Sequence, residues 1–143
     1  MNSATIKPGT RPSRRVGRSI AAVFFGFLTV VVLSLGTDQI LHLVHFYPPW
    51  GDPMWDPTQN LAALLYRCLY TVIGGYVASW TAPHTPMRHV WILGIIGLMM
   101  GTLGAVGTWN LKLGPHWYPI AIAVTGLPLT LLGGVLQRKS GRS

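Results

Sequence analysis

Four stretches of about 20 mostly apolar residues each constrain the fold of this chain more than any other feature. They cover residues 19–44, 60–80, 89–108 and 117–137. A helix of that length crosses the hydrocarbon core of a bilayer, and inside lipid each stretch must satisfy its own backbone hydrogen bonds, which an α-helix does. Short proline-rich segments separate the stretches. The sequence therefore predicts an all-α integral membrane protein, an antiparallel four-helix transmembrane bundle.

The positions of Lys and Arg predict how this bundle is oriented. Nine of the 11 lie in the two ends of the chain or in the connection between the second and third stretches, whereas Lys112 lies in a connection on the opposite side. Short segments rich in Lys and Arg remain in the cytoplasm. We therefore expect both termini to be cytoplasmic. The nine basic residues are Lys7, Arg11, Arg14, Arg15, Arg18, Arg88, Arg138, Lys139 and Arg142.

The chain is predicted to hold one domain between two tails. Residues 1–18 are expected to form a basic, disordered cytoplasmic tail, residues 19–137 the transmembrane domain, and residues 138–143 a second basic cytoplasmic tail. The first apolar stretch also resembles a secretory signal peptide, because basic residues precede it and the small residues Ser34 and Gly36 precede Thr37. The apolar character continues to Val44, which favours an uncleaved span.

The composition argues against a nucleic-acid-binding protein. The formal net charge is +8, but half of the 143 residues are hydrophobic and only 10% are charged. The basic residues flank apolar stretches, where they would contact anionic lipid headgroups. We therefore expect no nucleic-acid partner. The expected partners are the lipid bilayer and other membrane protein subunits or further copies of this chain.

Asp38 and Arg67 place opposite charges inside apolar stretches, where charges are costly and usually pair. Counted from the predicted outer ends of the first two stretches, both lie at a depth of roughly 12 Å. The sequence therefore predicts an intramembrane ion pair between neighbouring helices, with Tyr66 or Tyr70 as an additional hydrogen-bond donor. We expect the pair to hold the bundle together, and a role in transport or proton movement is the alternative.

A second set of polar residues lies toward the predicted outer side. Asp38, His42 and His45 are spaced i, i+4 and i+7, so they share one face of a helix. Imidazole and carboxylate groups bind Zn²⁺, and imidazole also relays protons near neutral pH. The simpler interpretation is that these groups are hydrated at the outer end of the bundle. The candidate metal, cofactor or proton site comprises His42, His45, Asp52, Asp56 and His116.

Glycines predict where the helices approach one another closely. Small residues three or four positions apart let two membrane helices bring their backbones together. Five glycines at this spacing form a stripe in the third stretch, and two adjacent glycines lie in the second. We expect packing within the bundle, with packing against another protein as the alternative. These glycines are Gly74, Gly75, Gly94, Gly97, Gly101, Gly104 and Gly107.

Three segments carry a family resemblance, and Leu127-Pro128 and Gly133-Gly134 accompany them. They are Tyr66-Arg-Cys-Leu-Tyr-Thr-Val-Ile-Gly-Gly-Tyr76, Ala82-Pro-His-Thr-Pro-Met-Arg-His89 and Gly114-Pro-His-Trp-Tyr-Pro119. Together they resemble a family of small four-span bacterial inner-membrane proteins. The resemblance implies four crossings and a place in the bacterial inner (cell) membrane, and it implies no activity.

These features favour a membrane protein that is not an enzyme. No serine has a His–Asp setting, and the sequence contains no phosphate-binding loop or pair of catalytic acids. We expect a structural or accessory subunit, or a scaffold, of a membrane complex. A small-molecule or ion transporter that uses Asp38 and Arg67 is the alternative, and a metal- or cofactor-binding membrane protein is a third. No cofactor is predicted, although a bound lipid or a hydrophobic cofactor fits the apolar composition.

Overall fold

The computed structural model describes residues 12–141, which form four α-helices and no β-strand. Each helix is long and apolar enough to cross a membrane. The prediction of an all-helical chain with four apolar spans is therefore confirmed. The helices are α1 (Pro12–Leu43), α2 (Pro57–Thr81), α3 (Pro86–Thr108) and α4 (Trp117–Ser140).

Local sequence explains where α2 and α3 begin. Asp56 caps α2, because its side chain accepts a hydrogen bond of 2.7 Å from the Thr58 backbone N–H. Pro57 and Pro86 occupy the first turns of α2 and α3, where a missing backbone N–H breaks no helical hydrogen bond. Both helices therefore begin shortly before residues 60 and 89, where the apolar stretches start.

Parts of both predicted tails are helical. Residues 12–18 belong to α1, and residues 138–140 belong to α4, whereas residues 1–11 lie outside the described part of the chain. A helix need not end at the edge of the hydrocarbon, because Arg and Lys are good helix formers. Arg138 and Lys139 also lie in the last turn of α4, where cations interact favourably with the helix dipole. The 32 residues of α1 span about 48 Å, more than the ~30 Å of a hydrocarbon core.

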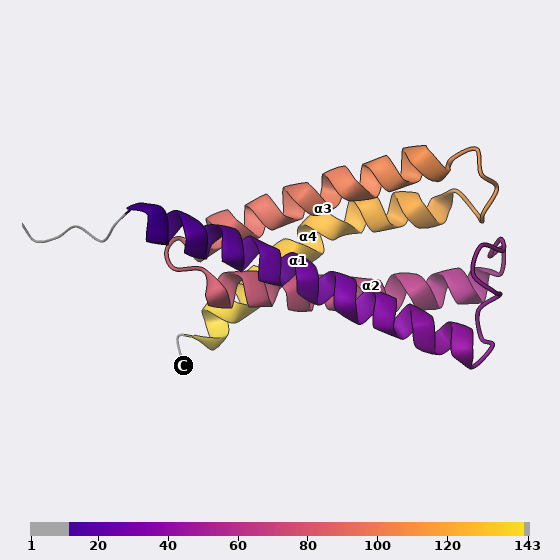
Figure 1. Cartoon of the computed structure of the whole chain (residues 1–143), viewed down its shortest axis with the longest axis horizontal. Coiled ribbons are helices and arrows are strands. Elements are labelled where there is room, and N and C mark those ends of the chain that lie inside the picture. The colour runs from indigo at the N-terminus through magenta and orange to yellow at the C-terminus, as the bar shows by residue number, and fades with distance from the viewer. Residues whose placement is uncertain (1–11, 142–143) are drawn as a thin grey trace, which may run out of the picture.

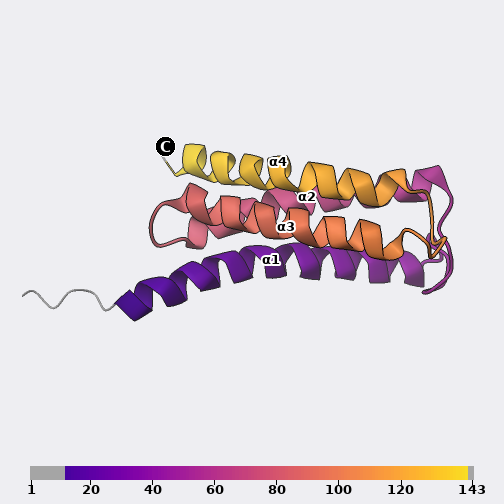
Figure 2. The same ribbon diagram turned by 90° about the horizontal axis from the view of Figure 1, so that it is seen from above.

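The four helices form one elongated bundle (Figure 1). The α1–α2 and α3–α4 connections lie at one end, which we call the two-loop end. The α2–α3 connection, the start of α1 and the end of α4 lie at the other, which we call the tail end. Viewed from above, α1 and α4 lie on opposite sides with α2 and α3 between them (Figure 2). α2 packs against both α1 and α4, and α3 packs mainly against α4.

Glycines set the close approach of α2 to its two neighbours. A Cβ on Gly75 would overlap the backbone carbonyl of Thr130 in α4, and a Cβ on Gly133 would overlap the Val72 carbonyl in α2. Toward α1, a Cβ on Gly26 would lie 2.8 Å from the Gly74 carbonyl oxygen. Close backbone contact of this kind increases dispersion contacts between membrane helices. The predicted packing role of Gly74 and Gly75 agrees with these positions.

The glycine stripe of α3 divides between two environments. Cβ atoms on Gly94 and Gly101 would meet α4, the latter at 3.0 Å from the Ala123 Cα. Cβ atoms on Gly97, Gly104 and Gly107 would meet no atom of another described segment within 4 Å. The expectation that all five pack within the bundle is therefore wrong for these three. The reason is helical geometry: residues seven apart nearly share a face, whereas steps of three rotate the stripe away from α4.

Large apolar side chains cover the outside of the bundle. Phe24, Leu69, Leu103 and Val124, one on each helix, are all more than half exposed. Such a surface is unfavourable in water and matches the hydrocarbon of a bilayer. Together with the four long apolar helices, it indicates a multi-pass membrane protein.

Candidate functional site

The most constrained polar group within the spans is the Asp38 carboxylate of α1. Arg67 of α2 donates from Nη2 to Asp38 Oδ2 at 2.5 Å, and the Tyr66 hydroxyl donates to Oδ1. Both carboxylate oxygens therefore have a donor. The Asp38 side chain is 7% exposed and that of Arg67 is 33% exposed. The structure thus brings together the two charges that the sequence placed at the same depth.

Tyrosines extend this contact into a polar cluster between α1 and α2. The Tyr66 hydroxyl lies 3.1 Å from the hydroxyl of Tyr47, which is 5% exposed in the α1–α2 connection. Burial raises the pKa of Tyr47, which further favours the protonated hydroxyl. Tyr70, the other donor that the sequence suggested, instead pairs with Thr37 at 2.7 Å. Tyr47 was not predicted, because nothing in the loop sequence shows that its ring turns inward.

The pair has the features of a structural contact. Charges inside lipid are tolerated when they are paired and hydrogen-bonded, as Asp38 is on both oxygens. Arg67 is less completely satisfied, since its Nε is buried and has no hydrogen-bond partner in the described part of the chain. The Nε–H of the guanidinium is therefore an unused donor.

Arg67 also lines a cavity of about 360 Å³ at the two-loop end. Asn60 of α2, Tyr118 of α4 and His116 line the same space, together with the end of α3. The Asn60 side chain already donates to the Met54 and Asp56 carbonyls at 2.9 Å each. The cavity is thus a small, partly polar space beside the ion pair. The sequence did not predict it, because apolar spacing does not show how far two helix pairs diverge.

The histidines and aspartates of the candidate metal site are dispersed. Within residues 12–141, no three His, Cys, Asp or Glu side chains are placed to hold a metal ion. His42 Nδ1 lies 2.6 Å from the Asp38 backbone oxygen, and its ring stacks on Trp50 at 3.8 Å between centroids. His116 stacks on Trp109 at 4.2 Å. Asp56 caps α2, whereas His45 and Asp52 are exposed loop residues.

The spacing argument for this site failed at the end of α1. The helix ends at Leu43, and His45 has a positive φ of 61°. His45 therefore does not continue the helical face that begins at Asp38. His42 remains on α1, but its ring is held by Trp50 of the connection.

The fold and the polar cluster define a class, a multi-pass membrane protein with four candidate spans and, among the described residues, an ion pair that joins two of them. No protein-family model matches the sequence, and no curated protein or solved structure is significantly similar to it. The resemblance to small bacterial inner-membrane proteins therefore stays a prediction.

Proposed function

We propose that this chain is a structural or accessory subunit of a membrane complex in the bacterial inner membrane. In this proposal it forms an antiparallel four-helix transmembrane bundle with both termini in the cytoplasm. The concentration of Lys and Arg in segments at the tail end supports this orientation. The pairing of Asp38 with Arg67 and Tyr66 supports a structural role for the intramembrane charges.

The observation that supports the accessory role most is the uncovered glycine face of α3. Gly97 and Gly107 meet no other described segment of this chain and leave part of the α3 backbone uncovered, whereas Gly104 lines the cavity beside Arg67. Small residues at such a face allow a further membrane helix to approach closely. A helix of a larger partner or of a second copy fits this face.

Substitution of the glycine face tests the proposal. The variant Gly97→Leu/Gly107→Leu and the control Gly36→Leu in α1 place leucine where a Cβ would meet no other described segment within 4 Å. Partners are purified gently from native membranes and quantified by mass spectrometry. We expect the α3 variant to lose its membrane-protein partner by about tenfold, equivalent to ~1.4 kcal/mol, and the α1 control to retain it. Equal recovery from wild type and the α3 variant contradicts the accessory role of this face.

Transport through the two-loop end is a second candidate, favoured by the cavity that Arg67 lines. Proton flux into liposomes, followed with an entrapped pH-sensitive dye, is compared between wild type and Asp38→Asn. A flux that falls in the variant supports transport, because Asp38 is the only acidic side chain within the four helices. Equal flux in the two proteins removes this candidate.

A further inference from the structure

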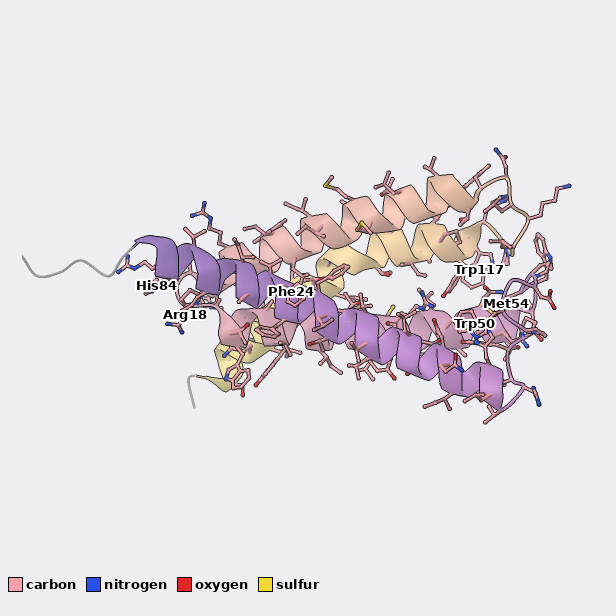
Figure 3. All side chains as sticks on the ribbon, viewed as in Figure 1. Arg18, Phe24, Trp50, Met54, His84 and Trp117 are labelled. Atoms are coloured by element: carbon pink, nitrogen blue, oxygen red, sulfur yellow. The ribbon has the colours of Figure 1, made fainter. Side chains whose placement is uncertain are left out.

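A second, larger open cavity lies at the tail end, between the first half of α1 and the first half of α3. Its volume is about 720 Å³. Its walls are apolar along most of their length, with Phe24 and Phe27 on α1 and Ile92 and Ile96 on α3. Figure 3 shows Phe24 on α1 and His84 at the tail end, far from Trp50 and Trp117. We call this space the tail-end groove.

The basic residues of the tail-end groove gather at its mouth, where the groove opens at the tail end. Arg15 of α1 and Arg88 of α3 line it, and His84 of the α2–α3 connection lies beside them. The chain has three acidic side chains, all described by the structure, and none lines this groove. They are Asp38, Asp52 and Asp56, and Figure 3 places Trp50 and Met54, their neighbours in the sequence, at the two-loop end. The mouth of the groove is therefore positive.

The start of α3 adds the positive end of a helix dipole to this mouth. Thr85, which lines the groove, precedes α3 and makes no side-chain capping hydrogen bond within the described chain, and the first turn contains no acidic residue. Pro86 has no N–H and the Arg88 N–H already donates to the Thr85 carbonyl at 3.0 Å, so α3 acts on an anion here through the positive end of its dipole. His89, which is 6% exposed, places a buried polar ring in the same wall, with Nδ1 3.1 Å from the Thr85 carbonyl oxygen.

The length of the groove matches one leaflet of a bilayer. From Arg15 to Phe27 the helix rises roughly 18 Å, and from Arg88 to Ile96 it rises roughly 12 Å. One leaflet of hydrocarbon is about 15 Å thick, half of the full core. A molecule with a negative group at the mouth and an acyl chain along the walls would fill the groove.

We infer that the tail-end groove binds one anionic phospholipid selectively. Its phosphate lies beside Arg88 and Arg15, and an acyl chain follows Phe24 and Ile92 toward the middle of the bundle. Charge complementarity at the mouth selects an anionic headgroup over a zwitterionic one. This inference does not require the accessory role of the chain.

Native mass spectrometry of the purified full chain tests this inference. The protein is titrated with phosphatidylglycerol and with phosphatidylcholine of the same acyl chains. We expect wild type to bind phosphatidylglycerol at least about fivefold more tightly. Arg88→Gln is expected to weaken phosphatidylglycerol binding by about fivefold, and the control Arg138→Gln, which removes an exposed cation of α4 outside the groove, is expected to leave it unchanged.

A third variant separates the groove from diffuse surface charge. Ser19→Phe places a ring in the groove and keeps every charge, so it is expected to reduce phosphatidylglycerol binding while the melting temperature stays near that of wild type. Equal affinity for the two lipids overturns the inference, as does an equal loss in Arg88→Gln and Arg138→Gln. Displacement of the lipid by inorganic phosphate at the same concentration also overturns it, because the apolar walls would then contribute nothing. If Ser19→Phe unfolds, the comparison of the two arginine variants still decides.

Discussion

Among single residues, Asp38 has the least freedom to change. Its carboxylate is almost fully buried between α1 and α2 and has donors from Arg67 and Tyr66. Removing Arg67 leaves the carboxylate charge unpaired, and removing Tyr66 leaves one carboxylate oxygen without a donor, in a medium that does not solvate either group. The two helices are therefore coupled through this residue as well as through their apolar faces.

The ion pair predicts non-additive mutational effects. Arg67→Ala alone is expected to destabilise the protein by about 3 kcal/mol, because it leaves Asp38 buried and unpaired. Adding Asp38→Asn removes that charge, so the double variant is expected to be more stable than Arg67→Ala. Thermal melts in detergent measure the four proteins of the cycle, and simple additivity would argue against the pair.

The two tyrosines of α2 provide a matched comparison. Tyr66→Phe removes a donor to a carboxylate and is expected to cost about 2 kcal/mol, whereas Tyr70→Phe removes a contact with the neutral Thr37 hydroxyl and is expected to cost about 1 kcal/mol or less. Each change deletes one hydroxyl from the same helix. Melting temperatures in one detergent give the order, and a larger loss for Tyr70→Phe would be inconsistent with this view of the cluster.

Among the helices, α2 is the central element because it packs against both α1 and α4. Its approach to α4 depends on Gly75 and Gly133, which leave no room for a Cβ. The α3 helix differs, since it packs mainly against α4 and leaves part of its glycine stripe uncovered. The same residue type therefore has opposite roles on two helices.

This difference predicts opposite outcomes for the same substitution. Gly133→Ala is expected to destabilise by about 1–3 kcal/mol, because the added Cβ forces α4 away from α2. Gly97→Ala meets no atom of another described segment within 4 Å and is expected to be neutral or to stabilise by up to about 1 kcal/mol, since alanine is the better helix former. Unfolding in detergent checks both, and a larger loss for Gly97→Ala would refute this assignment of the two faces.

Much of the element-level description could be predicted from the sequence, and the limits have physical causes. Apolar length and proline positions located the four helices to within a few residues at most ends. The equal depth predicted for Asp38 and Arg67 correctly indicated that their side chains pair. Residue spacing does not show which neighbour a face meets, so Gly97, Gly104 and Gly107 were misplaced.

Two properties of the candidate sites could not be predicted from residue spacing, namely where α1 ends and where a groove forms between helices. The end of α1 at Leu43 removed His45 from the face of Asp38. The tail-end groove lies between α1 and α3, which are not consecutive helices, so spacing along the chain does not show it. Only the positive charge near its mouth was visible in the sequence.

At the scale of the whole molecule, acidic and basic side chains gather at opposite ends of the bundle, and apolar surface lies between them. The acidic side chains Asp38, Asp52 and Asp56 belong to the half of α1 and the connection nearest the two-loop end, and most described basic residues lie toward the tail end. Exposed apolar side chains cover the four helices between the two ends. This distribution is what the positive-inside rule associates with a cytoplasmic tail end.

Cysteine accessibility in cells tests the proposed four crossings with a cytoplasmic tail end most directly. In a Cys68→Ser background, single cysteines replace Asn110 in the α3–α4 connection or Gly141 after α4, both exposed and uncharged positions. A membrane-impermeant maleimide is added to spheroplasts before and after permeabilisation. The account predicts that Asn110→Cys reacts in intact spheroplasts and that Gly141→Cys reacts only after permeabilisation. Labelling of Gly141→Cys in intact spheroplasts, or protection of Asn110→Cys, would contradict it.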